Sequence, residues 1–389
     1  MDTTLLRQHI RFLASDELKG RGASTPEEQR AAEYIAEQFR LLRLAPKGQN
    51  GTYLQRFPLV KRNDSVLDST RTAINVLGFL DNKAQQTIIL GAHYDHLGLG
   101  YDGGSLDPAP QGKIHNGADD NASGVAGMLE LARHYATNTV QEPYNMLFIG
   151  FSAEELGLLG SKYFCEHPTI PLESVHCMIN LDMIGRLNEK KELLVGGTGT
   201  SPVFEPLIES LAQSVGVGNL VVAKDSSGVG PSDHTSFYLK KIPILFFFTG
   251  VHSDYHKPSD DEEKINIQGE ATVLQLVATL IDSIQRLPKL PFQQTRTRQQ
   301  ATHSYRVSLG IVPSYSYTGK GLRIDAVTQG RPAAKAGMQE GDIIINIDGK
   351  EITDIQAYMQ VLSKLQPSQT IRVRVLRDTE PIDLIVMLQ

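Results

Sequence analysis

Cysteine is scarce in this sequence. The 389 residues include two cysteines, Cys165 and Cys177. Two thiols cannot form the disulfide framework of a small secreted domain, and their spacing does not match a set of zinc ligands. We therefore expect both to be ordinary buried thiols, which leaves the redox compartment open.

Long apolar segments and an excess of basic residues are also missing. The run from Ile242 to Phe248 has the length of a buried strand, whereas a membrane-spanning helix needs about 20 apolar residues. The formal net charge is −6 at pH 7, so the chain offers no positive field to a phosphate backbone. We expect neither a membrane span nor a nucleic-acid partner.

The composition is that of a folded globular protein. Hydrophobic residues make up 40% and charged residues 21% of the chain, which excludes disordered and coiled-coil classes. Residues 1–4 lack the charged and apolar regions of a signal peptide. The chain is therefore either cytoplasmic or a mature form with an added methionine.

Predicted strands and helices alternate along the first three quarters of the chain, which favours an α/β layer sandwich with a mixed, largely parallel sheet. Two helices are expected within 4–44, on either side of a glycine-rich break at 19–22. The other expected helices cover 122–136, 202–215 and 269–286, and the strands cover 53–59, 71–80, 86–90, 145–151, 175–181 and 242–248.

A polar segment separates this region from a smaller one. Residues 288–302 have almost no apolar residues and no periodicity, as expected of a linker. We predict a first domain over 1–288, a linker over 289–303 and a second domain over 304–389. In the second domain the expected strands cover 322–327, 342–347, 370–376 and 382–388, and one helix covers 355–365.

Acidic and histidine residues follow the ends of the predicted strands. Ligands bind at this edge in open α/β sheets, so we expect these side chains to form one polar cluster. The residues are His93, Asp95, Asp119, Glu154, Glu155, Asp182 and His256. The glycine- and proline-rich segment 97–113 beside them is expected to be a surface loop, with a pocket rim or a calcium site as alternatives.

Imidazole and carboxylate groups in this combination are typical ligands of two divalent metals that share a carboxylate, and zinc fits them best. The adjacent acids Glu154 and Glu155 provide two roles, since one can ligate while the other moves a proton. Each residue taken alone is as well explained as a surface acid or a core histidine. Their joint position at strand ends favours a metal site.

Five motifs in order resemble the di-zinc aminopeptidase family, which includes bacterial leucyl aminopeptidases and glutamate carboxypeptidase. The resemblance covers about residues 2–286, and the segment 12–22 (FLASDELKGRG) is typical of bacterial members. The motifs are GAHYDH (91–96), GADDNASG (117–124), SAEELG (152–157), NLDMIG (180–185) and YHKPSD (255–260).

The resemblance implies a zinc exopeptidase fold, of the phosphorylase/hydrolase-like type, with two Zn²⁺ per chain. His93 and Asp182 would hold one zinc, Glu155 and His256 the other, and Asp119 would bridge them. Glu154 would be the general base that takes a proton from a metal-bridged water. Asp95 would orient His93 through the second ring nitrogen.

The resemblance also implies a role for Tyr255, and the loop position of Asp233 suggests a role in the substrate pocket. Tyr255 would stabilise the oxyanion of the tetrahedral intermediate, and Asp233 would contact the amino terminus of a peptide. Ser232, Asp233 and His234 are adjacent in sequence, so they cannot form a nucleophilic triad. His252 competes with His256, which we prefer because it directly precedes the Lys-Pro-Ser-Asp turn. His96 and His115 are expected either to contact the ligands without binding metal themselves or to lie in loops.

The C-terminal region resembles a PDZ domain of the bacterial protease type over about residues 305–389, a small α+β fold. Such domains add a peptide strand to a sheet edge and hold its terminal carboxylate. Leu309, Gly310 and Ile311 would form the carboxylate loop, and a peptide or protein C-terminus would be the partner. The alternative is a domain that binds no peptide.

Together these features predict a metallo-aminopeptidase that releases N-terminal residues from peptides. The alternatives are a glutaminyl-cyclase-like acyltransferase, a carboxypeptidase, and an inactive scaffold whose PDZ domain does the work. A periplasmic or secreted location follows by analogy with relatives, and a cytoplasmic one is not excluded by the sequence.

Overall fold

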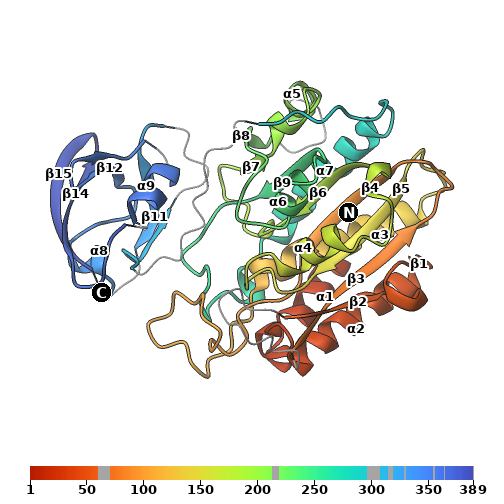
Figure 1. The fold of residues 1–389 in the computed structure, drawn as a ribbon, viewed down its shortest axis with the longest axis horizontal. Coiled ribbons are helices and arrows are strands. Elements are labelled where there is room, and N and C mark those ends of the chain that lie inside the picture. The colour runs from red at the N-terminus through yellow and green to blue at the C-terminus, as the bar shows by residue number, and fades with distance from the viewer. Residues whose placement is uncertain are drawn as a thin grey trace. The chain divides into compact units, whose positions relative to one another are not determined.

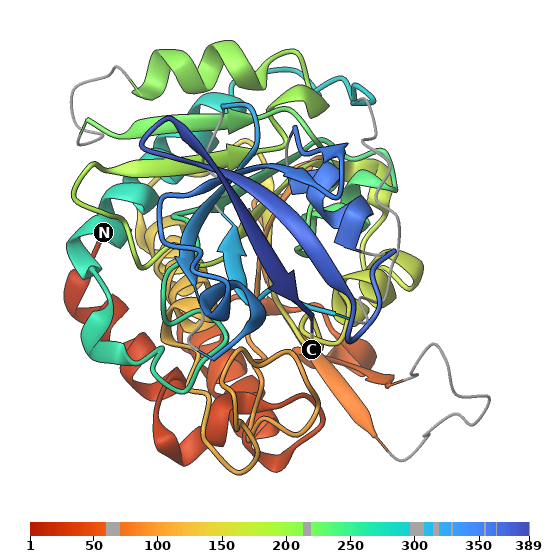
Figure 2. The same cartoon turned by 90° about the vertical axis from the view of Figure 1, so that its left-hand side faces the viewer.

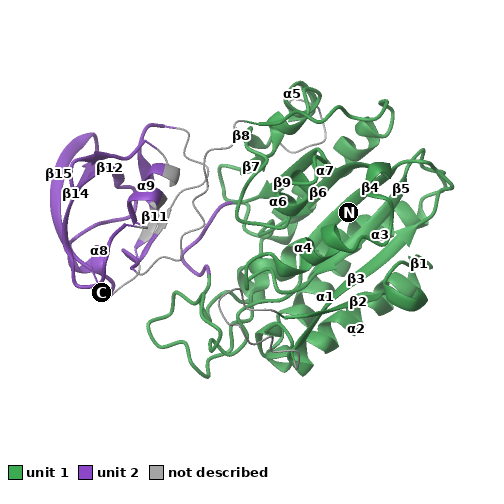
Figure 3. Ribbon diagram, viewed as in Figure 1, with its two compact units in different colours: residues 1–249, 256–296 green, residues 250–255, 297–389 purple. Residues whose placement is uncertain are grey.

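The computed structural model divides the chain into two compact units. Unit 1 contains residues 1–249 and 256–296, and unit 2 contains residues 250–255 and 297–389 (Figure 3). The structure describes residues 1–59, 71–212, 219–295, 307–313, 319–327, 330–353, 355–362 and 364–388.

Unit 1 is built on a mixed nine-stranded sheet (Figure 1). The strand order is β1-β3-β5-β4-β6-β9-β7-β8, and β2 pairs with β3. Strands β5, β4, β6 and β9 run parallel to one another in the centre. The strands are β1 (Ala45–Pro46), β2 (Leu54–Pro58), β3 (Thr72–Leu80), β4 (Thr87–His93), β5 (Asn145–Phe151), β6 (Val175–Leu181), β7 (Glu192–Gly196), β8 (Val221–Asp225) and β9 (Ile244–Phe248).

Helices cover both faces of this sheet. Helix α3 contacts α1, α2 and α7, while α4 and α6 contact each other. The helices are α1 (Thr3–Leu13), α2 (Pro26–Leu41), α3 (Gly124–Thr137), α4 (Leu159–Glu166), α5 (Phe204–Ala212), α6 (His234–Tyr238) and α7 (Ile267–Ile284). Two short helical turns, η1 (Asp16–Arg21) and η3 (Ala118–Ser123), lie between longer elements.

Successive residues of the central strands pack into different cores. Ile88 and Leu90 of β4 belong to the core that contains α1, α3 and α7, whereas Ile89 belongs to the core that contains Phe164 of α4. Because side chains alternate across a strand, both faces are buried. The unit is therefore the three-layer α/β sandwich expected from the sequence.

Most predicted elements of unit 1 are present. Strands β5 and β6 match the predicted bounds, and the two N-terminal helices flank the glycine-containing turn η1. The sequence did not predict the short elements α4, β7, β8 and α6, because five to eight residues give too little periodicity to recognise. The predicted linker 289–303 falls partly on 296–303, outside the described residues, so the domain boundaries stay a prediction.

Unit 2 contains an antiparallel sheet of order β10-β11-β12-β14-β15, with β13 paired to β12. The long hairpin of β14 and β15 is visible along its length in Figure 2. The elements are β10 (Ile311–Pro313), β11 (Leu322–Val327), α8 (Pro332–Lys335), β12 (Ile343–Ile347), β13 (Lys350–Glu351), α9 (Ile355–Leu362), β14 (Thr370–Arg377) and β15 (Glu380–Met387).

The expectation that the two cysteines are ordinary buried thiols is met. Cys165 and Cys177 are buried free thiols, and burial raises the pKa of Cys165 to about 12. None of the described helices is long and apolar enough to cross a bilayer.

Candidate metal centre

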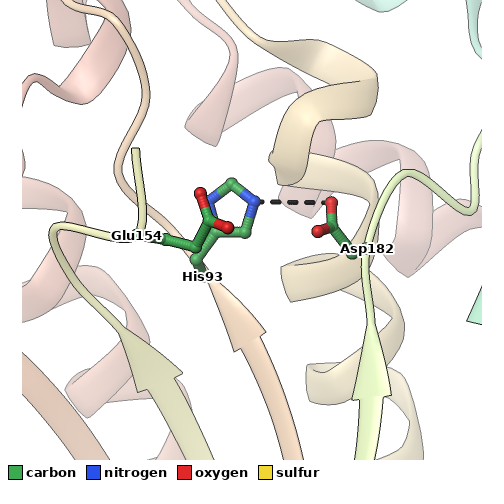
Figure 4. Close-up of side chains that lie close together, drawn as sticks. All are labelled: His93, Glu154 and Asp182. Atoms are coloured by element: carbon green, nitrogen blue, oxygen red, sulfur yellow. Dashed lines mark ion pairs between the residues drawn. The ribbon is translucent and has the colours of Figure 1, made fainter. Parts of the chain in front are cut away.

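The carboxyl ends of three parallel strands bring the predicted residues together. His93 is the last residue of β4, Glu154 and Glu155 follow β5, and Asp182 follows β6. One ligand atom each from His93, Glu154 and Asp182 lies within 4.8 Å of the others (Figure 4). The strand-end argument from the sequence thus places these side chains in one cluster.

A first group of candidate metal ligands surrounds His93. Its Nε2 lies 3.3 Å from Asp120 Oδ1 and 3.4 Å from Asp182 Oδ1. Its Nδ1 lies 3.2 Å from the backbone oxygen of Asp95. A carbonyl can only accept, so Nδ1 carries the hydrogen in this contact, which leaves Nε2 as the ring nitrogen that could bind a metal lying between it and the two carboxylates.

A second group surrounds His256 in the same manner. Its Nε2 lies 3.1 Å from Asp120 Oδ2 and 3.3 Å from Glu155 Oε2. Its Nδ1 donates to the backbone oxygen of Gly104 at 2.8 Å. Asp120 therefore presents one oxygen to each histidine and joins the two groups.

These spacings fit two zinc ions. Zinc ligands at bond lengths of about 2.0–2.1 Å in a tetrahedron lie about 3.3–3.4 Å apart. The four distances from the histidine Nε2 atoms to carboxylate oxygens run from 3.1 to 3.4 Å. Each group has three candidate protein ligands. Catalytic zinc sites use three protein ligands and keep the fourth coordination position open.

The expectation that Asp119 bridges the metals requires correction. Asp119 Oδ1 accepts a hydrogen bond from the backbone N–H of Gly185 at 2.7 Å and one from Ser123 Oγ at 3.1 Å. Its carboxylate thus ties η3 to the loop after β6, while Asp120 lies between the histidines. The two adjacent aspartates look alike in sequence, and the backbone direction at η3 decides which one faces the centre.

Asp95 lies beside the centre, but its carboxylate does not form the expected hydrogen bond with His93. Its Oδ1 is 3.8 Å from His93 Nδ1, beyond hydrogen-bond distance. The backbone oxygen of Asp95 makes that contact instead, and Oδ1 accepts from the backbone N–H of Glu154 at 3.1 Å. Asp95 thus fixes the start of the loop that carries Glu154 and Glu155.

The carboxylates of the centre have opposite electrostatic environments. Burial raises the pKa of Glu154 well above its ordinary value; Glu155, Asp233 and Asp182 add to the rise and His93 opposes it. Burial also acts to raise the pKa of Glu155, but His256 and His96 outweigh it and lower the pKa to about 2. The two adjacent acids are therefore suited to different tasks, with Glu155 ionised and Glu154 able to hold a proton.

Asp233 belongs to the same buried region. Burial raises its pKa to about 7, while His93 opposes the shift and Asp182 favours it. Neither carboxylate oxygen has a hydrogen-bond partner among the described residues. The preceding residue, Ser232, donates to Asp182 Oδ2 at 2.7 Å and accepts from Asn180 Nδ2, so this string orients a candidate ligand and is not a triad.

His96 contacts a candidate ligand, one of the two roles expected of it, whereas the contact of Gly104 was not predicted. His96 Nδ1 lies 2.7 Å from Glu155 Oε1, and its position in the GAHYDH motif was the available signal. No signal in the sequence points to the Gly104 carbonyl as a partner of His256. The backbone N–H of Tyr255 donates to His252 at 3.1 Å, and the proposed role of Tyr255 with an oxyanion stays a prediction.

The predicted carboxylate loop of unit 2 immediately precedes and enters β10. Gly310 has φ +74°, and a Cβ there would lie 2.2 Å from Cβ of Arg331. Leu309 is buried, and its backbone oxygen accepts from Ala333 N at 2.8 Å. Glycine is thus required at 310, and peptide binding by this loop stays a prediction.

Comparison with known proteins places both units in families. Residues 75–281 match Peptidase family M28, and residues 300–388 match the PDZ domain family. Aminopeptidase YwaD of Bacillus subtilis is 31% identical over 210 residues, covering 51% of this chain and 42% of the relative. The chain thus spans less than half the length of that relative.

Solved structures share the fold at low sequence identity. The zinc aminopeptidase BSAP from Bacillus subtilis has a TM-score of 0.58 at 20% identity, covering 77% of this chain and 97% of the other. Porphyromonas gingivalis glutaminyl cyclase has a TM-score of 0.60 at 18% identity, covering 72% and 98%. The chain also carries a second unit of the PDZ type. Because the match to the peptidase model covers more than half of its length, the chain belongs to peptidase family M28.

Proposed function

We propose that the protein is a zinc-dependent aminopeptidase that hydrolyses the N-terminal bond of peptides. The observation that carries the proposal is the position of Asp120, whose two oxygens lie 3.3 and 3.1 Å from the Nε2 atoms of two different histidines. A shared carboxylate between two imidazole groups is the arrangement that a pair of zinc ions needs.

The ligand assignment follows from the two groups. His93 and Asp182 would hold one zinc, His256 and Glu155 the other, and Asp120 would bridge them. The ions, when bound, would polarise the scissile carbonyl and acidify a water. The low pKa of Glu155, about 2, keeps this ligand ionised at neutral pH.

Glu154 is the proposed general base. Burial raises its pKa, which makes the carboxylate a stronger base toward the attacking water. Glu154 accepts a proton from the attacking water as oxygen bonds to the carbonyl carbon, and it donates that proton to the amine as the C–N bond breaks. Asp95 assists by holding the backbone N–H of Glu154.

The charges around the centre favour a free amino terminus over a free carboxylate. Glu154 and Asp233, two carboxyl groups near His93 that are not assigned to a zinc ion, can accept hydrogen bonds from an ammonium group when ionised. Arg186, on the loop after Asp182, lies 4.0 Å from Asp260 Oδ1, so its charge is balanced within the protein. The aminopeptidase name of the relative YwaD agrees with this polarity.

A glutaminyl-cyclase activity is the second candidate, because the fold is as similar to a glutaminyl cyclase as to an aminopeptidase. Two complete sets of candidate ligands joined by Asp120 favour a two-metal peptidase.

Elemental analysis of protein purified without chelator, together with hydrolysis of a leucyl anilide, tests the proposal. Two zinc ions per chain and metal-dependent release of the anilide are expected. One zinc without hydrolysis, combined with cyclisation of an N-terminal glutaminyl peptide, would support the cyclase. Cleavage that persists after N-terminal acetylation of a peptide would exclude the aminopeptidase polarity and favour a carboxypeptidase.

A further inference from the structure

Arg21 is a fully buried arginine whose side chain reaches the segments that carry the metal ligands. It ends the turn η1 and is 0% exposed. The residue lies before the region 75–281 that matches the peptidase family. The family match therefore assigns nothing to it.

The guanidinium group donates to four backbone carbonyl oxygens. Nε donates to Tyr94 at 2.7 Å, Nη1 to Asn116 at 2.6 Å and also to Leu13, and Nη2 to Gly117 at 3.0 Å. Tyr94 lies between His93 and Asp95, and Asn116 and Gly117 directly precede η3, which carries Asp120. A single side chain thus connects the ends of two segments that supply ligands.

Among the described residues, the partners of the Arg21 guanidinium are backbone carbonyls and not carboxylates, although a buried cation normally has an ion-pair partner. Burial lowers the pKa of Arg21 to about 10, and the nearby charges of Asp95, Asp120, Asp260 and Glu155 oppose that shift. The arginine is therefore charged at neutral pH and lies close enough to these four carboxylates for their charges to stabilise it.

The backbone around Arg21 is held between the same segments. The backbone oxygen of Arg21 accepts from His96 N at 3.3 Å, and that of Gly20 accepts from Gly98 N at 3.0 Å. A Cβ at Gly20 would lie 2.3 Å from the backbone oxygen of His115. The η1 segment therefore fits closely between residues 96–98 and 115, and Arg21 cannot swing away with a loose loop.

We propose that Arg21 is a positioning residue of the metal centre. Its four hydrogen bonds hold the segment after β4 against the start of η3, which sets the 3.3 Å spacing of His93 and Asp120 before metal binds. Its positive charge offsets the carboxylates in the apo state. The inference rests on the metal site of the proposed function and is independent of which bond the enzyme cleaves.

Arg21→Lys and Arg21→Met test this role. Lysine keeps the charge but cannot reach four carbonyls with one ammonium, and methionine removes both charge and donors. Changes to groups that orient metal ligands typically reduce metal affinity by about 10- to 100-fold. We expect a loss of this size for Zn²⁺ with lysine, measured by chelator competition, a larger loss with methionine, and an altered absorption spectrum of the Co²⁺-loaded lysine variant.

Arg133→Lys is the matched control. Arg133 is a partly buried arginine that binds Glu130 through Nε and Nη2 at 2.7 and 2.8 Å. Its replacement should leave Zn²⁺ affinity and the Co²⁺ spectrum unchanged. A folded Arg21→Lys protein with wild-type affinity and spectrum would overturn the inference while leaving the proposed function intact. Failure of the wild-type chain to bind Zn²⁺ would overturn both.

Hydrogen exchange on the wild-type apo protein gives a second test, which does not depend on whether an Arg21 variant folds. If Arg21 organises the centre in advance, the backbone amides of Asp119 and Asp120, which donate to Asp260 Oδ2, stay protected after zinc is removed with a chelator. Loss of protection at these amides alone, with the central strands still protected, would show that metal and not Arg21 sets the geometry.

Discussion

Nδ1 of His96 lies 2.7 Å from Oε1 of Glu155. This distance is that of a hydrogen bond and is shorter than the spacing of about 3.3 Å between two ligands of one tetrahedral zinc. His96 therefore holds one oxygen of Glu155, and the other faces His256. The contact turns Glu155 so that a single oxygen is offered to a metal.

Removing this hydrogen bond should weaken one metal position more than the other. We expect His96→Phe to lower the affinity for the second Zn²⁺ by about 10- to 100-fold, so that titration gives one tight and one weak site. His176→Phe, at a buried histidine of β6, is the control and should retain both sites. Two unchanged affinities in His96→Phe would show that Glu155 needs no such partner.

The adjacent aspartates should respond differently to the same change. Asp120→Asn replaces the proposed bridge with a neutral amide and should reduce zinc content measured on the dialysed protein. Asp119→Asn keeps an oxygen that can accept from Gly185 and Ser123, so it should retain two zinc ions. The opposite pattern would restore Asp119 as the bridge.

Glu154→Gln tests the proton-transfer role. Glutamine has nearly the same shape but cannot accept and return the proton, so kcat for a leucyl anilide should fall by about 10²- to 10⁴-fold. The zinc content should stay at the wild-type value, because Glu154 is not assigned as a ligand. Near-normal kcat in this variant would remove Glu154 from the mechanism.

Buried histidines should make the fold sensitive to acid. Burial, aided by Lys289, lowers the pKa of His176 from 6.5 to about 4. The unfolded chain therefore binds a proton between these values while the folded chain does not, and stability falls as pH decreases through this range. For this one group the loss between pH 7 and pH 5 is about 2 kcal/mol.

Urea unfolding of the apo protein at the two pH values measures this loss. His176→Phe keeps an aromatic ring against Tyr144, whose centroid is 4.5 Å from that of His176, and should be about 2 kcal/mol less sensitive to acid than the wild type. An equal change in both proteins would mean that His176 is not titrated by unfolding.

Gly310→Ala should disrupt the predicted carboxylate loop of unit 2. Alanine at φ +74° is strained, and its Cβ would overlap the side chain of Arg331, so binding of a peptide C-terminus should be lost. Gly349→Ala is the matched control, because Gly349 has φ +80° with nothing within 4 Å of the added Cβ. It should cost about 1–2 kcal/mol of stability without loss of peptide binding. Equal binding by both variants would exclude the loop.

The sequence predicts the centre well where a residue's position follows from a strand. His93 is the last residue of one apolar strand and Asp182 directly follows another, so the sheet itself determines where they lie. Asp119 and Asp120 are adjacent residues within η3, and no hydrophobic periodicity in the sequence decides which of them faces the histidines.

Contacts between distant segments were not predictable from the sequence. Arg21 binds carbonyls 73, 95 and 96 residues further along the chain. These partners are backbone atoms, which any residue provides. Short elements such as β8 were not predicted for another reason. The residues of β8 are exposed or half-exposed and show no clear alternation of buried and exposed side chains.

The segment 97–113 is more than the surface loop expected from its glycine and proline content. The carbonyl of Gly104 accepts from His256 Nδ1, and the backbone N–H of Leu106 donates to the backbone oxygen of His256 at 2.9 Å. We therefore expect a protease nick or an engineered deletion in this loop to weaken the candidate metal site without changing a ligand. Shortening the loop would remove the acceptor that fixes which ring nitrogen of His256 carries the hydrogen.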